Sequence, residues 1–246
     1  DYFAIGLYNS SGTLLGGQET GKDTSFSAGV DQAGTYYVGI TTGNSYSHDS
    51  GEYGLTVTTS NTLGSVETED NSTLATADVL SNGQELKGQI ATSSDIDFYK
   101  ISIGQAGVIS LSFDAPTSSS YIDYFAIGLY DSSGTLLGYQ ETGKDTSFSA
   151  GVDQAGTYYV GITADNYYHD SGEYGLTASV STVLGNVETE DNSTFAKSDT
   201  LTNGQELKGQ IATSSDIDFY KISVGQAGSI SHVSYTHLTL PTNREV

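Results

Sequence analysis

The sequence predicts an all-β protein built from tandem jelly-roll-like β-sandwich domains, with about eight strands in each unit. Three observations support this prediction. A long segment of the chain repeats, apolar and polar residues alternate along short stretches, and glycine-rich turns separate these stretches. Alternation with a period of two is typical of a half-buried strand, and glycine between two such stretches is typical of a hairpin.

The internal repeat defines the domain boundaries. Residues 1–41 return at 123–163 with two differences, Asn9 for Asp131 and Gly17 for Tyr139, and residues 82–102 return at 203–223. A repeat this long is a whole domain, so each complete copy is expected to have its own core. We therefore predict the late half of one unit at residues 1–60, a complete unit at 61–181, and the early half of another unit at 182–232.

The two ends of the chain are expected to be incomplete. It opens inside a strand-like pattern, and residues 233–246 match nothing in the repeat. This last stretch resembles the translation of a sequencing adapter, and we exclude it from the fold prediction. Each half unit alone would expose an apolar face, so we expect the halves either to complement each other or to promote aggregation.

Eight strands are predicted in the complete unit, at residues 84–91, 97–103, 108–114, 124–130, 136–141, 146–152, 157–163 and 173–180. Alternation places apolar side chains on one face of three of these strands. These are Ile109, Leu111 and Phe113, then Phe125, Ile127 and Leu129, then Tyr158, Val160 and Ile162. Only residues 72–80 could form a helical turn.

Composition excludes several classes of function. The chain has 30 acidic and 8 basic residues and a net charge of -22, which repels nucleic acid and anionic lipid surfaces. No apolar run reaches the length of a membrane span, so membrane insertion is not expected. Cysteine is absent, which excludes disulfides and thiol chemistry. The acidity is explained equally well by solubility in an extracellular or salty medium and by cation binding.

No catalytic motif is found. The sequence contains no His-Glu-x-x-His helix, no Gly-x-Ser-x-Gly turn and no phosphate-binding glycine loop. His169, Asp170 and Ser171 are triad residue types, but adjacent residues on one turn cannot converge as base, orienting acid and nucleophile. The chain is therefore predicted not to be an enzyme.

Five motifs of the complete unit carry a family resemblance. They are EDNSTLATADVL, SSDIDFYKIS, YFAIGLYDSSGTLL, AGTYYVGI and SGEYGLT. In these motifs the chain resembles the bacterial pre-peptidase C-terminal domain, whose relatives include clostridial collagen-binding domains. The resemblance implies a β-sandwich that acts as a non-catalytic, extracellular binding or spacing module, secreted or on the cell surface, within a larger chain such as a protease.

Two alternatives to this function stay open. The units could be the passive stalk of a repetitive surface adhesin, or a carbohydrate-binding module. Partners would be an extracellular protein or a polysaccharide, and tyrosine is a good contact residue for either. Candidate contact residues are Tyr139, Tyr167 and Tyr168, although tyrosine in a sandwich more often packs in the core or at a strand edge.

The resemblance also implies calcium as a cofactor. The matching ligand positions are Glu67, Glu69, Asn71, Asp95 and Asp97, and in the next copy Glu188, Glu190, Asn192, Asp216 and Asp218. Calcium-binding relatives place an acid where this chain has Ser72 and Ser193. Glu-x-Glu and Asp-x-Asp direct alternate carboxylates to one side of an extended backbone, as a calcium site requires. Alternatively, these acids are solvated charges, or Asp95 and Asp97 accept backbone N–H bonds from a turn.

Overall fold

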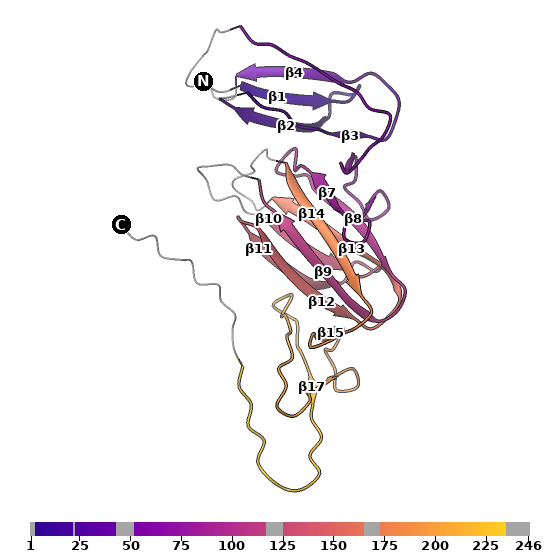
Figure 1. The fold of residues 1–246 in the computed structure, drawn as a ribbon, viewed down its shortest axis with the longest axis vertical. Helices are drawn as coiled ribbons and strands as arrows, with labels where there is room; N and C mark the ends of the chain where they lie inside the picture. Colours follow the sequence, from indigo (N-terminus) through magenta and orange to yellow (C-terminus); the bar gives the residue numbers. More distant parts are fainter. Residues whose placement is uncertain (1–2, 22, 43–51, 117–124, 165–172, 235–246) are drawn as a thin grey trace, which may run out of the picture.

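The computed structural model describes residues 3–21, 23–42, 52–116, 125–164 and 173–234. These residues form strands, turns and extended segments and contain no helix, which confirms the predicted all-β fold class. These ranges contain no helix with the length and apolar character needed to cross a membrane. Figure 1 shows three bodies in a row, with the complete unit in the middle and a half unit at each end.

The complete unit is a sandwich of two five-stranded sheets. The first sheet has the order β11-β10-β13-β8-β6 and the second has the order β15-β12-β9-β14-β7. The first consists of β6 (Asp78–Val79), β8 (Ile96–Ile103), β10 (Phe125–Tyr130), β11 (Leu136–Thr142) and β13 (Gly156–Ala164). The second consists of β7 (Glu85–Gly88), β9 (Gly107–Asp114), β12 (Thr146–Val152), β14 (Tyr174–Ser181) and β15 (Thr189–Glu190).

Most neighbouring strands in these sheets are antiparallel, and two pairs are parallel. Strand β6 runs parallel to β8, and β15 runs parallel to β12. All eight sequence-predicted strands are present, with bounds that differ by at most three residues. Strands β6 and β15 were not predicted, because two residues are too few to show an alternating pattern.

The core lies between the two sheets, where the predicted apolar faces meet. Phe113 of β9 packs against Phe125 of β10 and Tyr174 of β14, with ring centroids 5.0 and 5.3 Å apart. The nine residues expected to face the core are all buried. Burying each large apolar side chain contributes about 1.5–3 kcal/mol, so this face supplies much of the stability of the unit.

The N-terminal half unit repeats part of this architecture. Strands β1 (Phe3–Tyr8), β2 (Leu14–Thr20) and β4 (Tyr37–Thr42) form a three-stranded sheet with the same neighbours as β10, β11 and β13. The segment equivalent to β14 forms no strand, and Tyr53 and Leu55 are 59% and 48% exposed. Their counterparts Tyr174 and Leu176 are buried, because β7 and β9 are present to pair with β14.

The C-terminal half unit has one described strand pair. Strands β16 (Asp199–Thr200) and β17 (Tyr220–Lys221) are parallel, as β6 and β8 are in the complete unit. Ile222 and Val224, whose counterparts Ile101 and Ile103 are buried, are exposed. No described strand of one half unit pairs with a strand of the other, and the halves lie at opposite ends of the complete unit (Figure 1). The described part of the chain therefore does not show the complementation considered from the sequence.

Candidate metal centre

The segment that leads into the complete unit is held in an extended conformation. The N–H of Glu67 donates to the carbonyl of Lys87 at 2.9 Å, and the N–H of Lys87 donates to the carbonyl of Ser65 at 2.8 Å. The N–H and hydroxyl of Thr68 both donate to the carboxylate of Asp78, at 2.6 and 2.8 Å. Successive side chains of an extended segment point to opposite sides, so Glu67 and Glu69, one on each side of Thr68, point the same way.

Three carboxylates converge where this segment meets strand β8. One oxygen from each of Glu67, Glu69 and Asp97 lies within 4.8 Å of the others. Asp97 is 0% exposed, as is Asn71, whose Nδ2 donates to Glu67 Oε2 at 3.2 Å. The cluster combines two acids of the leading segment, one acid of β8 and the amide of Asn71.

Three oxygens of this cluster are buried without a hydrogen-bond partner. They are Oε1 of Glu69, Oδ1 of Asn71 and Oδ1 of Asp97. Buried polar atoms are nearly always paired, and each unpaired one costs about 1–3 kcal/mol. Unpartnered acceptors on Glu69 and Asp97, whose carboxylates converge with that of Glu67, and on the neighbouring Asn71 fit a site for a cation. The cluster can therefore hold a metal ion.

Hydrogen bonds fix both oxygens of Glu67 and the second oxygen of Asp97. Glu67 accepts from the backbone N–H of Gln89 and from the hydroxyl of Tyr99. The hydroxyl of Tyr174 donates to Asp97 Oδ2, and the hydroxyl oxygens of Tyr99 and Tyr174 are 2.6 Å apart. Both tyrosines are buried. They hold Glu67 and Asp97 in position and leave Oδ1 of Asp97 without a hydrogen-bond partner.

Burial and mutual repulsion raise the pKa values of these acids. Burial raises the pKa of Glu67 to about 8. Burial, followed by the charge of Glu67, raises the pKa of Glu69 to about 9. Burial, again followed by the charge of Glu67, raises the pKa of Asp97 well above its usual value. Three ionised carboxylates are thus unfavourable here unless a cation neutralises them.

The same cluster recurs at the start of the C-terminal half unit. Glu188, Glu190 and Asp218 bring one oxygen each to within 4.8 Å of the others, and Asn192 is buried beside them. The unpartnered oxygens are again Oε1 of the second glutamate, Oδ1 of the asparagine and Oδ1 of the aspartate. The peptide bonds after Glu69 and Glu190 are both cis. Two stretches of sequence therefore build the same arrangement.

The second cluster is less enclosed than the first. Burial, then nearby acids, raises the pKa of Glu190 to about 8 and that of Asp218 to about 6. Tyr220 donates to Glu188 as Tyr99 does to Glu67. The counterpart of Tyr174 belongs to the late half of a unit, and the C-terminal segment contains only the early half. A smaller electrostatic penalty is expected at this second cluster.

Asp95 and Asp216 lie beside the clusters but do not join the three converging oxygens. Oδ2 of Asp95 accepts from the N–H of Ala91 at 2.7 Å, and Oδ2 of Asp216 accepts from the N–H of Ala212 at 2.7 Å. The contact of Asp95 is the structural alternative that was considered for Asp95 and Asp97. Ser72, which stands where relatives place an acid, donates its N–H and hydroxyl to Asp70.

The position of Asp95 predicts a small effect of its substitution on metal binding. Asp95→Asn keeps an oxygen that can accept from Ala91, and it removes one charge near Glu69. We expect calcium affinity to change less than about tenfold, which corresponds to about 1.4 kcal/mol. Calorimetric titration of the variant checks this, and a loss of about a hundredfold or more would make Asp95 a ligand.

Tyrosines 99, 174 and 220 are the site residues that the sequence interpretation missed. Tyr99 follows Asp97 by two residues on β8, so strand alternation could have placed it on the same face. Nothing in the sequence connects Tyr174 with Asp97, which is 77 residues away along the chain. Its place in the network depends on the packing of the two sheets.

Of the three tyrosines suggested as ligand contacts, the structure describes only Tyr139. Tyr167 and Tyr168 lie outside the described residues. Tyr139 lies on β11, where its hydroxyl donates to Glu141 Oε1 at 2.7 Å and its backbone contacts Gln210 of the next unit. A role of Tyr139 in contacting a ligand stays a prediction.

Comparisons with known proteins identify a similarity to solved structures. No protein-family model matches the sequence, and no curated protein matches it. Among solved structures, the chain is similar to the crystal structure of the pre-peptidase C-terminal domain of a collagenase from Bacillus anthracis. The identity is 18%, the alignment covers 42% of this chain and 93% of that chain, and the TM-score is 0.32.

Proposed function

We propose that this chain is part of a tandem array of non-catalytic, extracellular β-sandwich modules of the pre-peptidase C-terminal type, each stabilised by a calcium ion at the start of the unit. The array would serve as a binding or spacing appendage of a larger bacterial protein such as a secreted protease. The observation that supports calcium is the recurrence of three buried, unpartnered oxygens in both copies of the cluster.

The donor atoms favour calcium over other metals. Carboxylate and amide oxygens are hard ligands, and neither cluster contains histidine or cysteine. Two oxygens bound to calcium at 2.3–2.6 Å can be up to about 5 Å apart, so donors within 4.8 Å of each other can share one ion. Magnesium usually retains several waters, which suits a buried four-residue cluster less well.

In the first cluster the ion would be held by Glu67, Glu69, Asn71 and Asp97. When bound, calcium supplies positive charge and oxygen coordination, and no chemical reaction is required of it. The two glutamates lie on the leading segment and Asp97 lies on β8, so an ion bound by all three would join the leading segment to β8. Neutralising their charges would tie the start of the unit to its core.

An extracellular location agrees with this use of calcium. Calcium-dependent extracellular modules bind the ion with dissociation constants of about 10⁻⁴–10⁻³ M, a range that is useful only where calcium is abundant. The net charge of -22 suits a protein that attracts cations. The family resemblance of the sequence motifs is what favours a non-catalytic appendage over a passive stalk or a carbohydrate-binding module.

Thermal unfolding of the full chain tests the calcium proposal. We expect the midpoint to rise by several degrees between a chelator and millimolar calcium, because a ligand at about ten times its dissociation constant stabilises by about 1.4 kcal/mol. Asp114→Asn, which removes an exposed acid of β9, is the matched control and should keep the rise. A midpoint that calcium does not move would contradict calcium stabilisation and favour the passive stalk.

A further inference from the structure

The segment that leads into each unit is hydrogen-bonded to two units at once. On one side, β5 (Thr68–Glu69) pairs in parallel with β3 (Gly29–Val30) of the preceding unit, and the N–H of Gly29 donates to the carbonyl of Glu67 at 3.0 Å. On the other side, the N–H of Glu67 bonds to Lys87 of its own unit. The backbone ladder therefore continues across the junction.

The second junction has the same ladder. Strand β15 pairs in parallel with β12 of the complete unit, with Gly151 opposite Thr189 and Val152 opposite Glu190. The N–H of Glu188 donates to the carbonyl of Lys208 in its own unit at 2.9 Å. The following unit thus donates one strand, β15, to the complete sandwich.

A glutamine side chain makes a second connection at each junction. Oε1 of Gln89 accepts from the N–H of Gly17 at 2.9 Å, and its Nε2 donates to the carbonyl of the same residue. Gln210 makes the same two bonds to Tyr139, with 3.0 Å from the N–H to Oε1. We call this pair of bonds the glutamine clamp. It contacts only backbone atoms of the preceding unit, so it tolerates the exchange of Gly17 for Tyr139.

Glycines in the preceding unit allow the close approach. A Cβ atom on Gly29 would lie 2.1 Å from the carbonyl oxygen of Glu67, and one on Gly151 would lie 2.1 Å from that of Glu188. Real Cβ atoms essentially never come this close to backbone atoms. The two surfaces therefore fit each other only with glycine at this position, and both junctions have it.

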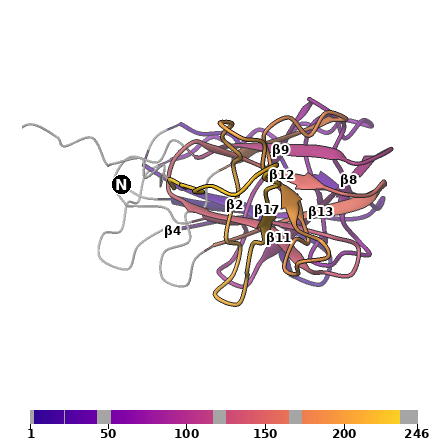
Figure 2. The ribbon, with the colours of Figure 1, turned by 90° about the horizontal axis from the view of Figure 1, so that it is seen from below.

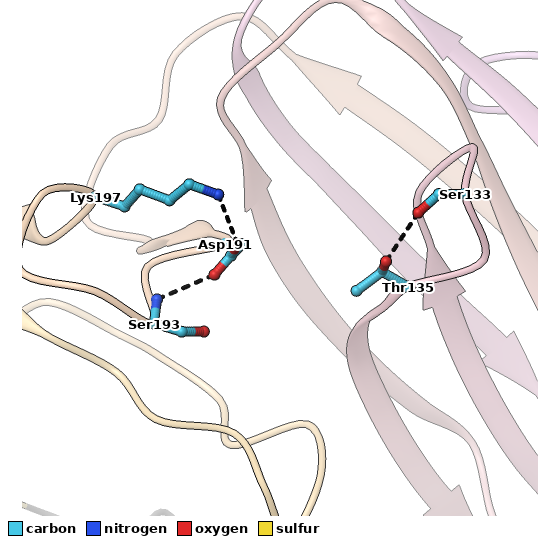
Figure 3. A network of polar contacts seen from close by, with 5 residues as sticks. All are labelled: Ser133, Thr135, Asp191, Ser193 and Lys197. Carbon is cyan, nitrogen blue, oxygen red and sulfur yellow. Dashed lines mark hydrogen bonds and ion pairs between the residues drawn. The ribbon is translucent and has the colours of Figure 1, made fainter.

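Near the second junction, the next unit contains an ion pair. Lys197 forms an ion pair with Asp191, 2.6 Å from Nζ to Oδ2, and the N–H of Ser193 donates to the same carboxylate at 3.1 Å. Figure 3 shows this network in one view with the turn of the complete unit that contains Ser133 and Thr135. Both residues of the ion pair belong to the next unit.

At the first junction the position of Lys197 is taken by Thr76. Thr76, Asp70 and Asp31 line a cavity of about 630 Å³ between the two units. The hydrogen bond and charge of Asp191 raise the pKa of Lys197. The charge of Asp153, the counterpart of Asp31, raises it by a smaller amount. The lysine therefore brings a positive charge to the place where acids of two units face each other.

We propose that the end of each unit is a docking surface for the start of the next unit, so that successive repeats stack in one fixed register and form a stiff rod. The surface consists of the β2 edge and β3 in the N-terminal half unit, and of the β11 edge and β12 in the complete unit. Figure 2, which looks along the long axis of Figure 1, shows the units one behind another. This inference requires neither calcium nor secretion.

Distance measurements between spin labels test the proposal on the full chain. The chain contains no cysteine, so spin labels attach only at cysteines that are introduced. Thr41→Cys on β4 and Ser102→Cys on β8 replace exposed residues and place one label on each side of the first junction. We expect one narrow distance distribution in double electron–electron resonance. Gln89→Ala, which removes the glutamine clamp, should broaden it at least twofold.

Matched controls separate docking from loss of folding. Gln84→Ala, which changes an exposed glutamine of the same unit, is the control for Gln89→Ala. Gly104→Ala, which adds a Cβ in open space, is the control for Gly29→Ala, which adds a Cβ against the carbonyl of Glu67. The controls should leave the distribution narrow, and circular dichroism should show all variants folded. A broad distribution in the parent chain, or equal widths for Gln89→Ala and Gln84→Ala, would overturn the proposal. Because each comparison is made in one buffer, failure of calcium binding would not produce either result.

Discussion

In calcium-free buffer, the free energy of unfolding of the chain is expected to fall as the pH rises from about 5 to about 9. The folded-state pKa values of Glu67 and Glu69 are about 8 and about 9, above the 4.5 of an ordinary glutamate. Between these limits the folded state binds more protons than the unfolded state. The stability that these protonated groups provide is therefore complete below about pH 4.5 and is lost as the pH rises through the folded-state values.

Calcium should remove most of this pH dependence. A bound cation keeps the carboxylates ionised in the folded state, so protons no longer need to be released as the pH rises. Within the window, each group contributes a slope of at most about 1.4 kcal/mol per pH unit. Denaturant unfolding at several pH values, with chelator and with millimolar calcium, measures both slopes. Stability that rises with pH in chelator would show that the cluster is not destabilised by its own charge.

The variant Asp97→Asn should have opposite effects with and without calcium. Asparagine has nearly the same shape and can still accept from Tyr174, but it removes one of three mutually repelling acids. In chelator we expect the unfolding midpoint to rise by several degrees. In calcium we expect affinity at the first cluster to fall about a hundredfold, which corresponds to about 2.7 kcal/mol.

The control for this change is the second cluster. Asp218→Asn makes the same substitution at a site where the pKa of the aspartate is raised only to about 6, so its stabilising effect in chelator should be smaller. Thermal unfolding of both variants in both buffers makes the comparison. If Asp97→Asn destabilises the chain equally in chelator and in calcium, Asp97 acts only as a hydrogen-bond acceptor for Tyr174.

Most of the sandwich could be predicted from the sequence because its strands are long enough to show alternation. Ile109, Leu111 and Phe113 mark β9 as a strand and also identify its core face, and both are confirmed. Strands of two residues, such as β6 and β15, carry no such pattern. They depend on the parallel partners that tertiary packing supplies.

The candidate site was partly accessible from the sequence. Glu67, Glu69, Asn71 and Asp97, which lie together in the structure, were all among the residues that the motif pattern suggested. Asp95 was indistinguishable from Asp97 in the sequence, because both precede or enter the same strand. Their separation into a turn acceptor and a member of the cluster follows from hydrogen bonds that only the fold defines.

The junction between units could not be predicted. The glutamine clamp joins Gln89 to a residue 72 positions earlier, and it uses backbone groups that leave no trace in the sequence. Gly151 lies within a predicted strand and Gly29 is its counterpart, and nothing in the sequence shows that a carbonyl of the next unit lies opposite each of them. The expectation that each unit is self-contained therefore missed the strand that the following unit donates.

Isothermal titration of calcium into the chelator-treated, dialysed full chain tests the central claim most directly. The two clusters predict two bound ions per chain, and Asp97→Asn should abolish one of them while Asp114→Asn leaves both. Binding should release protons, so the measured heat should depend on the ionisation enthalpy of the buffer. Absence of saturable binding at millimolar calcium, or binding that Asp97→Asn leaves unchanged, would contradict the proposal that these acids form a calcium site.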